Sequence, residues 1–476
     1  MRGRLFLEKV SLALPSKSLV KKKSRARLTS RASYGTLSSM KFVERGTLML
    51  SHHIRATYTA ILKEELQCAM GCTEPIAIAY AAAMLRDLLG SEPTAIRICL
   101  SGNIIKNVKS VIVPATGGLH GVEAAVAAGI VSGRYDLRLE LLSVIGEQER
   151  PRIAELIKRT HMAVEQLNSP CTFDLLLIGE CKEHTARVQI TGYHTNLTLA
   201  ERDGLDCTAR YRDTDQATAN TKNDSDRALL NVENIVAFAE QTELDELRPY
   251  LDRQIDMNVA IAEEGLRNRY GASIGQLLLR DGNASLKDRA RAYAAAGSDA
   301  RMSGCELPVC ILSESGNQGM TASLPVIVYA REMGVDHDAL LRALIVADLI
   351  TVHQKTGIGC LSAYCGAISA GCGAGAGICY LHGGRLHEIA HTLVNAVAIL
   401  SGTICDGAKP SCAAKIAMAV EAGIMGFEMA QTGREFFGGD GIVTKGVENT
   451  IRNVGQLARE GMSETDKEII RIMLGK

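Results

Sequence analysis

The chain has 476 residues, no tryptophan and a formal net charge of zero. A chain of this length exceeds the size at which one hydrophobic core keeps growing, so we expect two domains. The zero net charge argues against nucleic acid as the main partner, because that binding is driven by neutralisation of phosphates. Fourteen cysteines without a secretory signal indicate a reducing compartment and metal or redox chemistry, so we expect a cytoplasmic enzyme.

The first 50 or so residues carry twelve Lys or Arg against two acidic residues. This composition resembles an organellar transit peptide, and the alternative is a start of translation at Met40 or Met49. We favour the later start, because the first amphipathic pattern begins only at Ile54 and nothing before it can bury a core. Residues 1–53 are therefore set apart as a miscalled start or a targeting segment.

The sequence pattern of residues 54–235 predicts a small α/β part. Helical spacing of apolar residues covers 54–67 and 76–89, separated by Gly-Cys-Thr-Glu-Pro at 71–75, where Thr73 suits an N-cap and Pro75 the first turn. Residues 95–100 alternate as a strand, a helix follows from about Val122, and 175–178 with 186–191 predict a hairpin. Residues 200–226 are polar without periodicity, which predicts a loop or insertion.

Residues 236–476 predict an all-helical part, so the expected fold class is α+β and predominantly helical. The uncharged run 356–384 is long enough to span a bilayer, yet Gly, Ala, Ser and Cys dominate it. We therefore expect a buried helix pair that holds a site, and no membrane span. The glycines between Gly371 and Gly377 superficially resemble a dinucleotide loop, but no strand precedes them, so close helix packing is the better interpretation.

Eight of the fourteen cysteines lie between residues 300 and 412, which calls for a local explanation. Isolated cysteines are usually inert core residues, and that is the alternative for each of them. Cys405 and Cys412, however, flank a short loop with an Asp-Gly and a Lys-Pro step, which can direct two sulfurs to one site. With Cys365, they are interpreted as thiolate ligands of an iron–sulfur cluster carried by the helical part. Three thiolates without a fourth would leave one iron open to substrate, and four would close the site.

Cys72 stands just before a predicted helix, where unpaired N–H groups and the helix dipole favour a thiolate that can act as a base or nucleophile. The alternative is a cysteine that merely fills the turn. The loop 315–319 precedes a helix and is expected to cradle a carboxylate or phosphate, or to be an ordinary turn. The candidates for gripping the carboxylate and amino group of an amino acid are Asn103, Lys106, His194, Ser315 and Asn317.

Eight blocks in chain order resemble the L-cysteine desulfidase family, which is related to the alpha part of iron–sulfur L-serine dehydratases. These blocks are residues 71–75, 101–107, 113–117, 192–196, 298–301, 315–319, 361–365 and 404–412, and the resemblance extends from about residue 54 to the end of the chain. It implies a 4Fe-4S cluster held by Cys365, Cys405 and Cys412, with Cys72 as the base. The resemblance indicates the cluster more firmly than the substrate.

These features predict a β-elimination in which L-cysteine gives pyruvate, ammonia and sulfide, or the corresponding dehydration of L-serine. One rival is a pyridoxal-phosphate lyase with Lys355 or Lys415 as the Schiff-base lysine. Another is a non-enzymatic redox sensor that binds a cluster or zinc, although the Cys-x-x-Cys pairs of zinc modules are absent. We expect a small amino-acid substrate, no nucleic acid or membrane partner, and leave a homodimer open.

Overall fold

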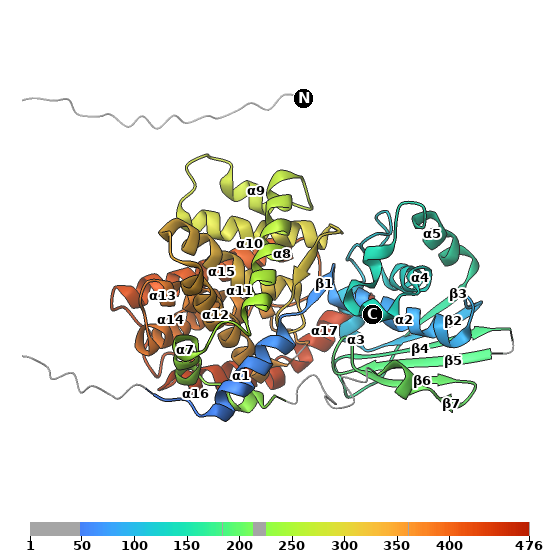
Figure 1. Cartoon of the computed structure of the whole chain (residues 1–476), viewed down its shortest axis with the longest axis horizontal. Coiled ribbons are helices and arrows are strands. Elements are labelled where there is room, and N and C mark those ends of the chain that lie inside the picture. Colours follow the sequence, from blue (N-terminus) through green and yellow to red (C-terminus); the bar gives the residue numbers. More distant parts are fainter. Residues whose placement is uncertain (1–47, 183, 213–224, 360, 476) are drawn as a thin grey trace, which may run out of the picture. The chain divides into compact units, whose positions relative to one another are not determined.

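The computed structural model describes residues 48–476 except 183, 213–224, 360 and 476 (Figure 1). The predictions for residues 1–47 lie outside the described residues. The expectation that nothing before Ile54 buries a core is wrong for the described part, because Leu50 belongs to the core and α1 begins at His52. Helices make up most of the described chain and strands are confined to two small sheets, which confirms the predicted class, α+β and predominantly helical. The domain boundary near residue 236 stays a prediction.

A six-stranded mixed sheet has the strand order β3-β2-β4-β5-β6-β7. Its strands are β2 (Ala95–Leu100), β3 (His161–Gln166), β4 (Asp174–Cys181), β5 (His184–Thr191), β6 (Leu197–Arg202) and β7 (Leu205–Asp206). Only β2 and β3 run parallel, and β4 and β5 form the predicted hairpin. The loop predicted for 200–226 is wrong in its described first part, because main-chain pairing with β5 extends β6 through Arg202, and β7 and α6 (Thr208–Tyr211) follow.

Helices cover one face of this sheet and lead toward the site. Helix α2 (Thr73–Leu89) packs on β4, β5 and β6, and α4 (Val122–Ser132) packs on α2. The two helices approach so closely that a Cβ at Gly129 would lie 2.0 Å from the carbonyl oxygen of Ala79. Sequence reasoning placed these helices but missed β3, whose residues are mostly exposed or half-buried and therefore show no strong apolar alternation. The remaining elements here are α3 (Gly102–Val108), η1 (Tyr135–Val144) and α5 (Arg150–Arg159).

The C-terminal half of the chain is helical as predicted (Figure 1). Its helices are α8 (Arg248–Arg267), α9 (Ile274–Leu279), α10 (Leu286–Met302), α11 (Gly316–Met333), α12 (His337–Ile358), α13 (Gly366–Leu381), α14 (Leu386–Ile399), α15 (Cys412–Gln431), α16 (Val447–Gln456), η3 (Leu457–Gly461) and α17 (Ser463–Leu474). The first helix of the described chain, α1 (His52–Glu65), and α7 (Val232–Gln241) both contact α12, while η2 (Arg227–Leu229) precedes α7.

Helix α13 lies between α12 and α15 and contacts both through backbone atoms. A Cβ at Gly371 would lie 2.3 Å from Ala419 O, and one at Gly373 would lie 2.4 Å from Ala347 O. Such distances leave no room for any side chain, which confirms close helix packing for the segment 371–377. Among the helices of the described residues, none is long and apolar enough to cross a membrane.

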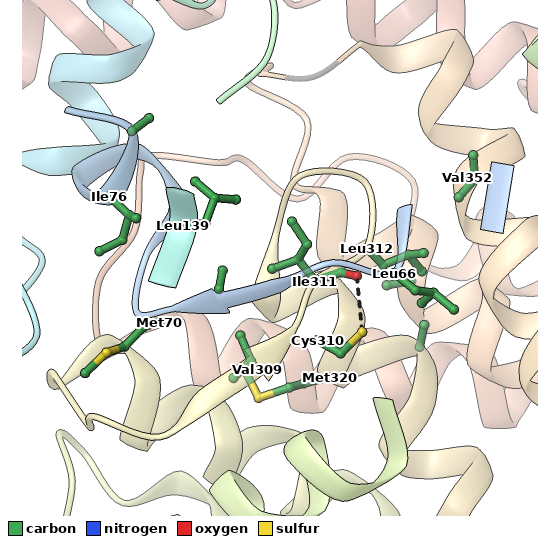
Figure 2. Close-up of a cluster of buried hydrophobic side chains, with 14 of the residues drawn as sticks. Leu66, Met70, Ile76, Leu139, Val309, Cys310, Ile311, Leu312, Met320 and Val352 are labelled. Atoms are coloured by element: carbon green, nitrogen blue, oxygen red, sulfur yellow. Dashed lines mark hydrogen bonds between the residues drawn. The ribbon is translucent and has the colours of Figure 1, made fainter. Parts of the chain in front are cut away.

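A second sheet joins two loops that reach the site. Strand β1 (Cys68–Met70) pairs antiparallel with β8 (Pro308–Cys310). Figure 2 shows this pair enclosed by buried apolar side chains that include Leu66, Ile76 and Met320, with the Cys310 thiol directed at the carbonyl of Ile311. The loop after β1 carries Cys72, and the turn after β8 carries Ser313 to Ser315. The apolar cluster therefore fixes both segments relative to each other.

Candidate active site

Four helices, α2, α11, α13 and α15, begin at one cavity. The first turn of a helix leaves N–H groups unpaired and carries partial positive charge, so four such ends favour anionic groups within the cavity. The structure brings seven of the nine predicted site residues to its lining: Cys72, His194, Ser315, Asn317, Cys365, Cys405 and Cys412.

Cys72 occupies the N-cap position of α2 and is 1% exposed. The preceding Gly71 has a φ of 79°, and a Cβ there would lie 2.3 Å from Pro114, so the sharp approach to Cys72 requires glycine. Burial raises the pKa of the Cys72 thiol to about 12, and Arg301 opposes this only in part. The predicted thiolate is therefore not the resting form near neutral pH. Thr73, predicted as the N-cap, lies one position later, and its hydroxyl donates to Glu314 O at 2.9 Å.

Cys365 and Cys405 are brought together by a short antiparallel bridge between Tyr364 and Ile404. The amide of Cys365 donates to Thr403 O, and that of Cys405 donates to Ala363 O. Cys365 is the N-cap of α13, and its thiol donates a hydrogen bond to the Cys405 sulfur. This bond lowers the pKa of Cys405 and raises that of Cys365.

Cys412 is the first residue of α15, and burial raises the pKa of its thiol. Its Sγ lies 3.7 Å from Gly407 O, within the loop that starts at Cys405. Lys415, on the next turn of α15, donates to Ile404 O at 2.8 Å and to Asp406 at 2.6 Å. Its charge helps to lower the pKa of Cys405. This lysine, one of the two Schiff-base nominees, is therefore held by its own ion pair outside the cavity lining.

The three thiols fit an iron–sulfur cluster by the chemistry of their donor atoms. Soft thiolates are the ligands that such clusters select, and each binds a different iron, so they need not converge on one point. Within the described ranges, no group of three or more His, Cys, Asp or Glu side chains is arranged around a single metal ion.

His194 is 1% exposed and is held from two sides. Its Nδ1 lies 2.5 Å from the Glu314 carboxylate, and its ring packs edge-on against Phe173. Whenever Glu314 is ionised it can only accept, which places a proton on Nδ1 and directs Nε2 elsewhere. The Nε2 atom has no hydrogen-bond partner among the described residues. A buried, unpartnered nitrogen at a cavity wall is available to a ligand.

Glu314 reaches His194 through a strained turn. Ser313 and Glu314 have φ values of 47° and 64°, between the bridged residues Leu312 and Ser315. Such conformations cost non-glycine residues about 1–3 kcal/mol each and occur preferentially at functional sites. The turn is held by the amide of Ser313, which donates to Glu65, and by the Thr73 hydroxyl. The sequence held no signal for Glu314 apart from its place before Ser315.

Helix α11 begins at the predicted loop, with Ser315 as its N-cap. The Ser315 side chain makes no capping bond, so its hydroxyl remains at the cavity wall. Asn317 accepts from Arg301 at 3.2 Å, and Gln318 has an Oε1 without a partner in the described part of the chain. Sequence reasoning missed Arg301 and Gln318 as lining residues, although both fall within the family-like blocks 298–301 and 315–319.

The other two predicted site residues, Asn103 and Lys106, are not brought to the cavity lining. Both donate at 2.6 Å to Asp466 on α17, and the Lys106 side chain is 1% exposed. Lys106 still lies close enough to Cys405 to help lower the pKa of that thiol. The Asp466 carboxylate therefore binds the Asn103 and Lys106 side chains, which we expected to bind a substrate.

The lining also includes two acids that were not predicted, Glu74 and Glu314, and a lysine that was named only for the rival mechanism. Glu74 accepts from Asn107 at 2.8 Å, and it is 9% exposed. Lys355, the other Schiff-base nominee, lines the cavity and donates to Gly359 O at 2.5 Å. The lining therefore carries both signs of charge beside its thiols, a combination that suits a small zwitterion.

The fold and the site together define a predominantly helical α+β protein with a thiol-lined cavity. Residues 137–471 match the family described as serine dehydratase alpha chain, and the chain belongs to this family. A UPF0597 protein of Desulfitobacterium hafniense (strain Y51) is 53% identical over 88% of this chain and 97% of its own length. UPF0597 proteins of Lachnoclostridium phytofermentans and Finegoldia magna are 46% and 44% identical, over 87% and 88% of this chain and 98% and 99% of their own.

Family membership confirms the predicted relation to the alpha part of serine dehydratases and indicates a lyase-type enzyme.

Proposed function

We propose that the protein is an iron–sulfur-dependent β-elimination lyase that converts L-cysteine to pyruvate, ammonia and sulfide, with L-serine as the alternative substrate. The observation that carries the proposal is the meeting of three thiols from two distant segments with Cys72 at one buried cavity. Inert core cysteines have no reason to gather at the starts of three helices around one cavity.

Cys365, Cys405 and Cys412 would hold a 4Fe-4S cluster. Its chemistry, when bound through three thiolates, is that of a Lewis acid at the remaining iron, which favours departure of a thiol or hydroxyl group. The lysine charges near Cys405 favour the thiolate form of that ligand. Cys365 and Cys412 stand at helix starts, whose positive ends oppose in part the rise in their pKa values.

Cys72 is the proposed base for the α proton. It must first lose its own proton, and the neighbouring Arg301 lowers the pKa of its thiol and so assists that loss. The proton leaves Cα for the Cys72 sulfur, the Cβ–S bond breaks, and its electron pair departs with the sulfide. The remaining aminoacrylate tautomerises to an imine, and water hydrolyses it to pyruvate and ammonia.

His194 and Gln318 are proposed to orient the substrate. The unpartnered Nε2 of His194 and Oε1 of Gln318 are acceptors that suit the hydrogens of an amino group. Both side chains are at least nine-tenths buried, so they compete with little water and are held in place by neighbouring groups.

Iron and sulfide analysis of anaerobically purified protein tests the proposal. We expect about four iron and four sulfide per chain, with sulfide and pyruvate formed from L-cysteine. Cys405→Ser should lose iron and turnover, whereas the matched control Cys379→Ser, a buried cysteine inside α13 away from the lining, should keep both. Protein that contains no iron or sulfide and still eliminates sulfide would disprove the cluster. A yellow colour in such iron-free protein would favour a pyridoxal-phosphate enzyme with Lys355.

A second variant separates the base from the ligands. Cys72→Ala should retain iron and visible absorption yet lose roughly two to four orders of magnitude in turnover. Exchange of the substrate α proton with deuterated solvent should be lost together with elimination. Loss of iron as complete as in Cys405→Ser would instead make Cys72 a fourth ligand, and persistent exchange would move the base to His194.

Relative kcat/KM values for L-cysteine and L-serine would decide between the two substrates. A protein that binds iron and sulfide but eliminates neither compound would favour the redox-sensor alternative.

A further inference from the structure

Arg301 is a buried cation at the cavity wall. It lies in the last turn of α10, is 3% exposed, and lines the cavity. Its Nε donates to Gly71 O at 3.0 Å, and its Nη1 donates to Asn317 Oδ1 at 3.2 Å. The guanidinium lies against Gly316 so closely that a Cβ there would be 2.6 Å from Nε. Glycine at the start of α11 is thus what admits the guanidinium to the cavity.

The charge of Arg301 is not balanced by any carboxylate among the described residues. Both of its acceptors are neutral, a backbone carbonyl and an amide side chain. A guanidinium stays charged at all physiological pH values, and burying such a charge without a counter-ion is costly. An anion that enters the cavity would supply the missing partner, and the planar fork of arginine matches a carboxylate.

Carboxylates lie elsewhere on the cavity wall. Glu74 hydrogen-bonds to neutral groups, Asn107 and the Thr73 hydroxyl, and forms no ion pair in the described part of the chain. Gln318 adds an acceptor oxygen without a partner. The lining therefore offers a guanidinium for an anionic group and oxygens for a cationic one, as a zwitterion requires.

We infer that Arg301, aided by Asn317, binds the α-carboxylate of the substrate and thereby restricts the enzyme to free amino acids. This inference rests on the proposed function, because it names the group by which that substrate is held. Lys106, one of the five residues expected to grip the carboxylate and amino group, is paired with Asp466 instead. Amines without a carboxylate, amides and peptides are accordingly poor substrates.

The test compares Arg301→Gln and Arg301→Lys with wild type and with Arg291→Gln, all as full-length, anaerobically purified protein. Arg291 is a matched control, because it lies on the same helix but pairs with Glu421 outside the cavity lining. The probes are L-cysteine and cysteamine, which has the same thiol and amino group but no carboxylate. Cysteamine is measured as a competitive inhibitor of L-cysteine turnover.

We expect Arg301→Gln to raise the KM for L-cysteine about 10- to 100-fold and to leave the inhibition constant of cysteamine unchanged. Arg301→Lys should show a smaller rise, since it keeps the charge but loses the fork. Arg291→Gln should behave as wild type in both measurements. If Arg301→Gln does not fold, the KM for L-cysteine and the inhibition constant of cysteamine are compared between Arg301→Lys and wild type instead.

Three results would overturn the inference. These are an unchanged KM for L-cysteine, an equal loss of cysteamine binding, or a fall in kcat alone, which would assign Arg301 to the Cys72 thiol. If wild-type protein eliminates nothing, the proposed function fails separately. Thermal stabilisation by L-cysteine over cysteamine, lost in Arg301→Gln, would then still support carboxylate binding, and no such difference would refute it.

Discussion

The spacing between α13 and α15 depends on Gly423, and its replacement by alanine tests whether that spacing matters to the thiols. A Cβ at Gly423 would lie 2.0 Å from Gly371 O on α13, well short of the 3.4 Å at which ordinary contact begins. Because the contacted atom belongs to the backbone of α13, the added methyl group can be accommodated only if α13 and α15 move apart. Because Cys365 and Cys412 stand at the starts of these helices, the separation of their sulfurs should change as well.

The expected cost in stability is moderate. Overpacking of this kind costs up to about 3 kcal/mol, and alanine returns about 1 kcal/mol as a better helix former, so the net loss is about 2 kcal/mol. Gly265→Ala is the matched control, because its Cβ would meet Ala296 O at 2.1 Å between α8 and α10. Unfolding by urea measures the stability of both variants, and iron and sulfide analysis measures their clusters.

We expect the two variants to lose similar stability while only Gly423→Ala loses iron, to well below the wild-type content. Full iron content in Gly423→Ala at a measured loss of about 2 kcal/mol would refute the dependence of the thiols on helix spacing. Equal iron loss in both variants would also refute it, because general destabilisation would then suffice.

Two further predictions concern acidic residues, the partly buried Glu314 and the buried Asp348. Glu314→Gln should lower kcat about 10- to 100-fold with little change in melting temperature, because it weakens the hydrogen bond that orients His194. A kcat and a pH–rate profile equal to those of wild type would contradict this prediction. Burial raises the pKa of Asp348 to about 7 from its ordinary 3.8. The native state then binds the extra proton between these values, so wild-type stability should fall as pH rises through this window, by at most about 4 kcal/mol. In Asp348→Asn, the free energies of unfolding measured with urea at pH 5 and pH 8 should no longer show this fall. The same pH dependence as in wild type would contradict the raised pKa of Asp348.

Local patterns predicted the helices and strands well where one face is buried. The strand at 95–100 and the hairpin before residue 191 were found because their apolar residues alternate, whereas β3 has no buried face to reveal it. The cap of α2 was displaced by one residue, because the Thr73 hydroxyl bonds to Glu314, a partner distant in the sequence. Short-range patterns cannot anticipate such a contact.

The cavity was predictable in its thiols and less so in its charges. Cysteines in loops before helices gave a distinctive signal, and all four of those proposed for the site line one cavity. Lys106 was misplaced because its partner, Asp466, belongs to a helix at the end of the chain. Arg301 could be noticed only once the structure showed a buried guanidinium without a carboxylate partner in the described residues.

The bridge between Tyr364 and Ile404 has a consequence for biosynthesis. The groups that meet at the cavity come from positions as far apart as Cys72 and Cys412, so a ribosome must release most of the chain before they can assemble. Cys72 and Cys365 reach the cavity from segments far in the sequence from the loop that carries Cys405 and Cys412, whereas a zinc finger gathers its ligands from one short segment and folds around the metal. Metal delivery would thus act on a nearly finished protein, and truncated chains would offer no binding site to compete for iron.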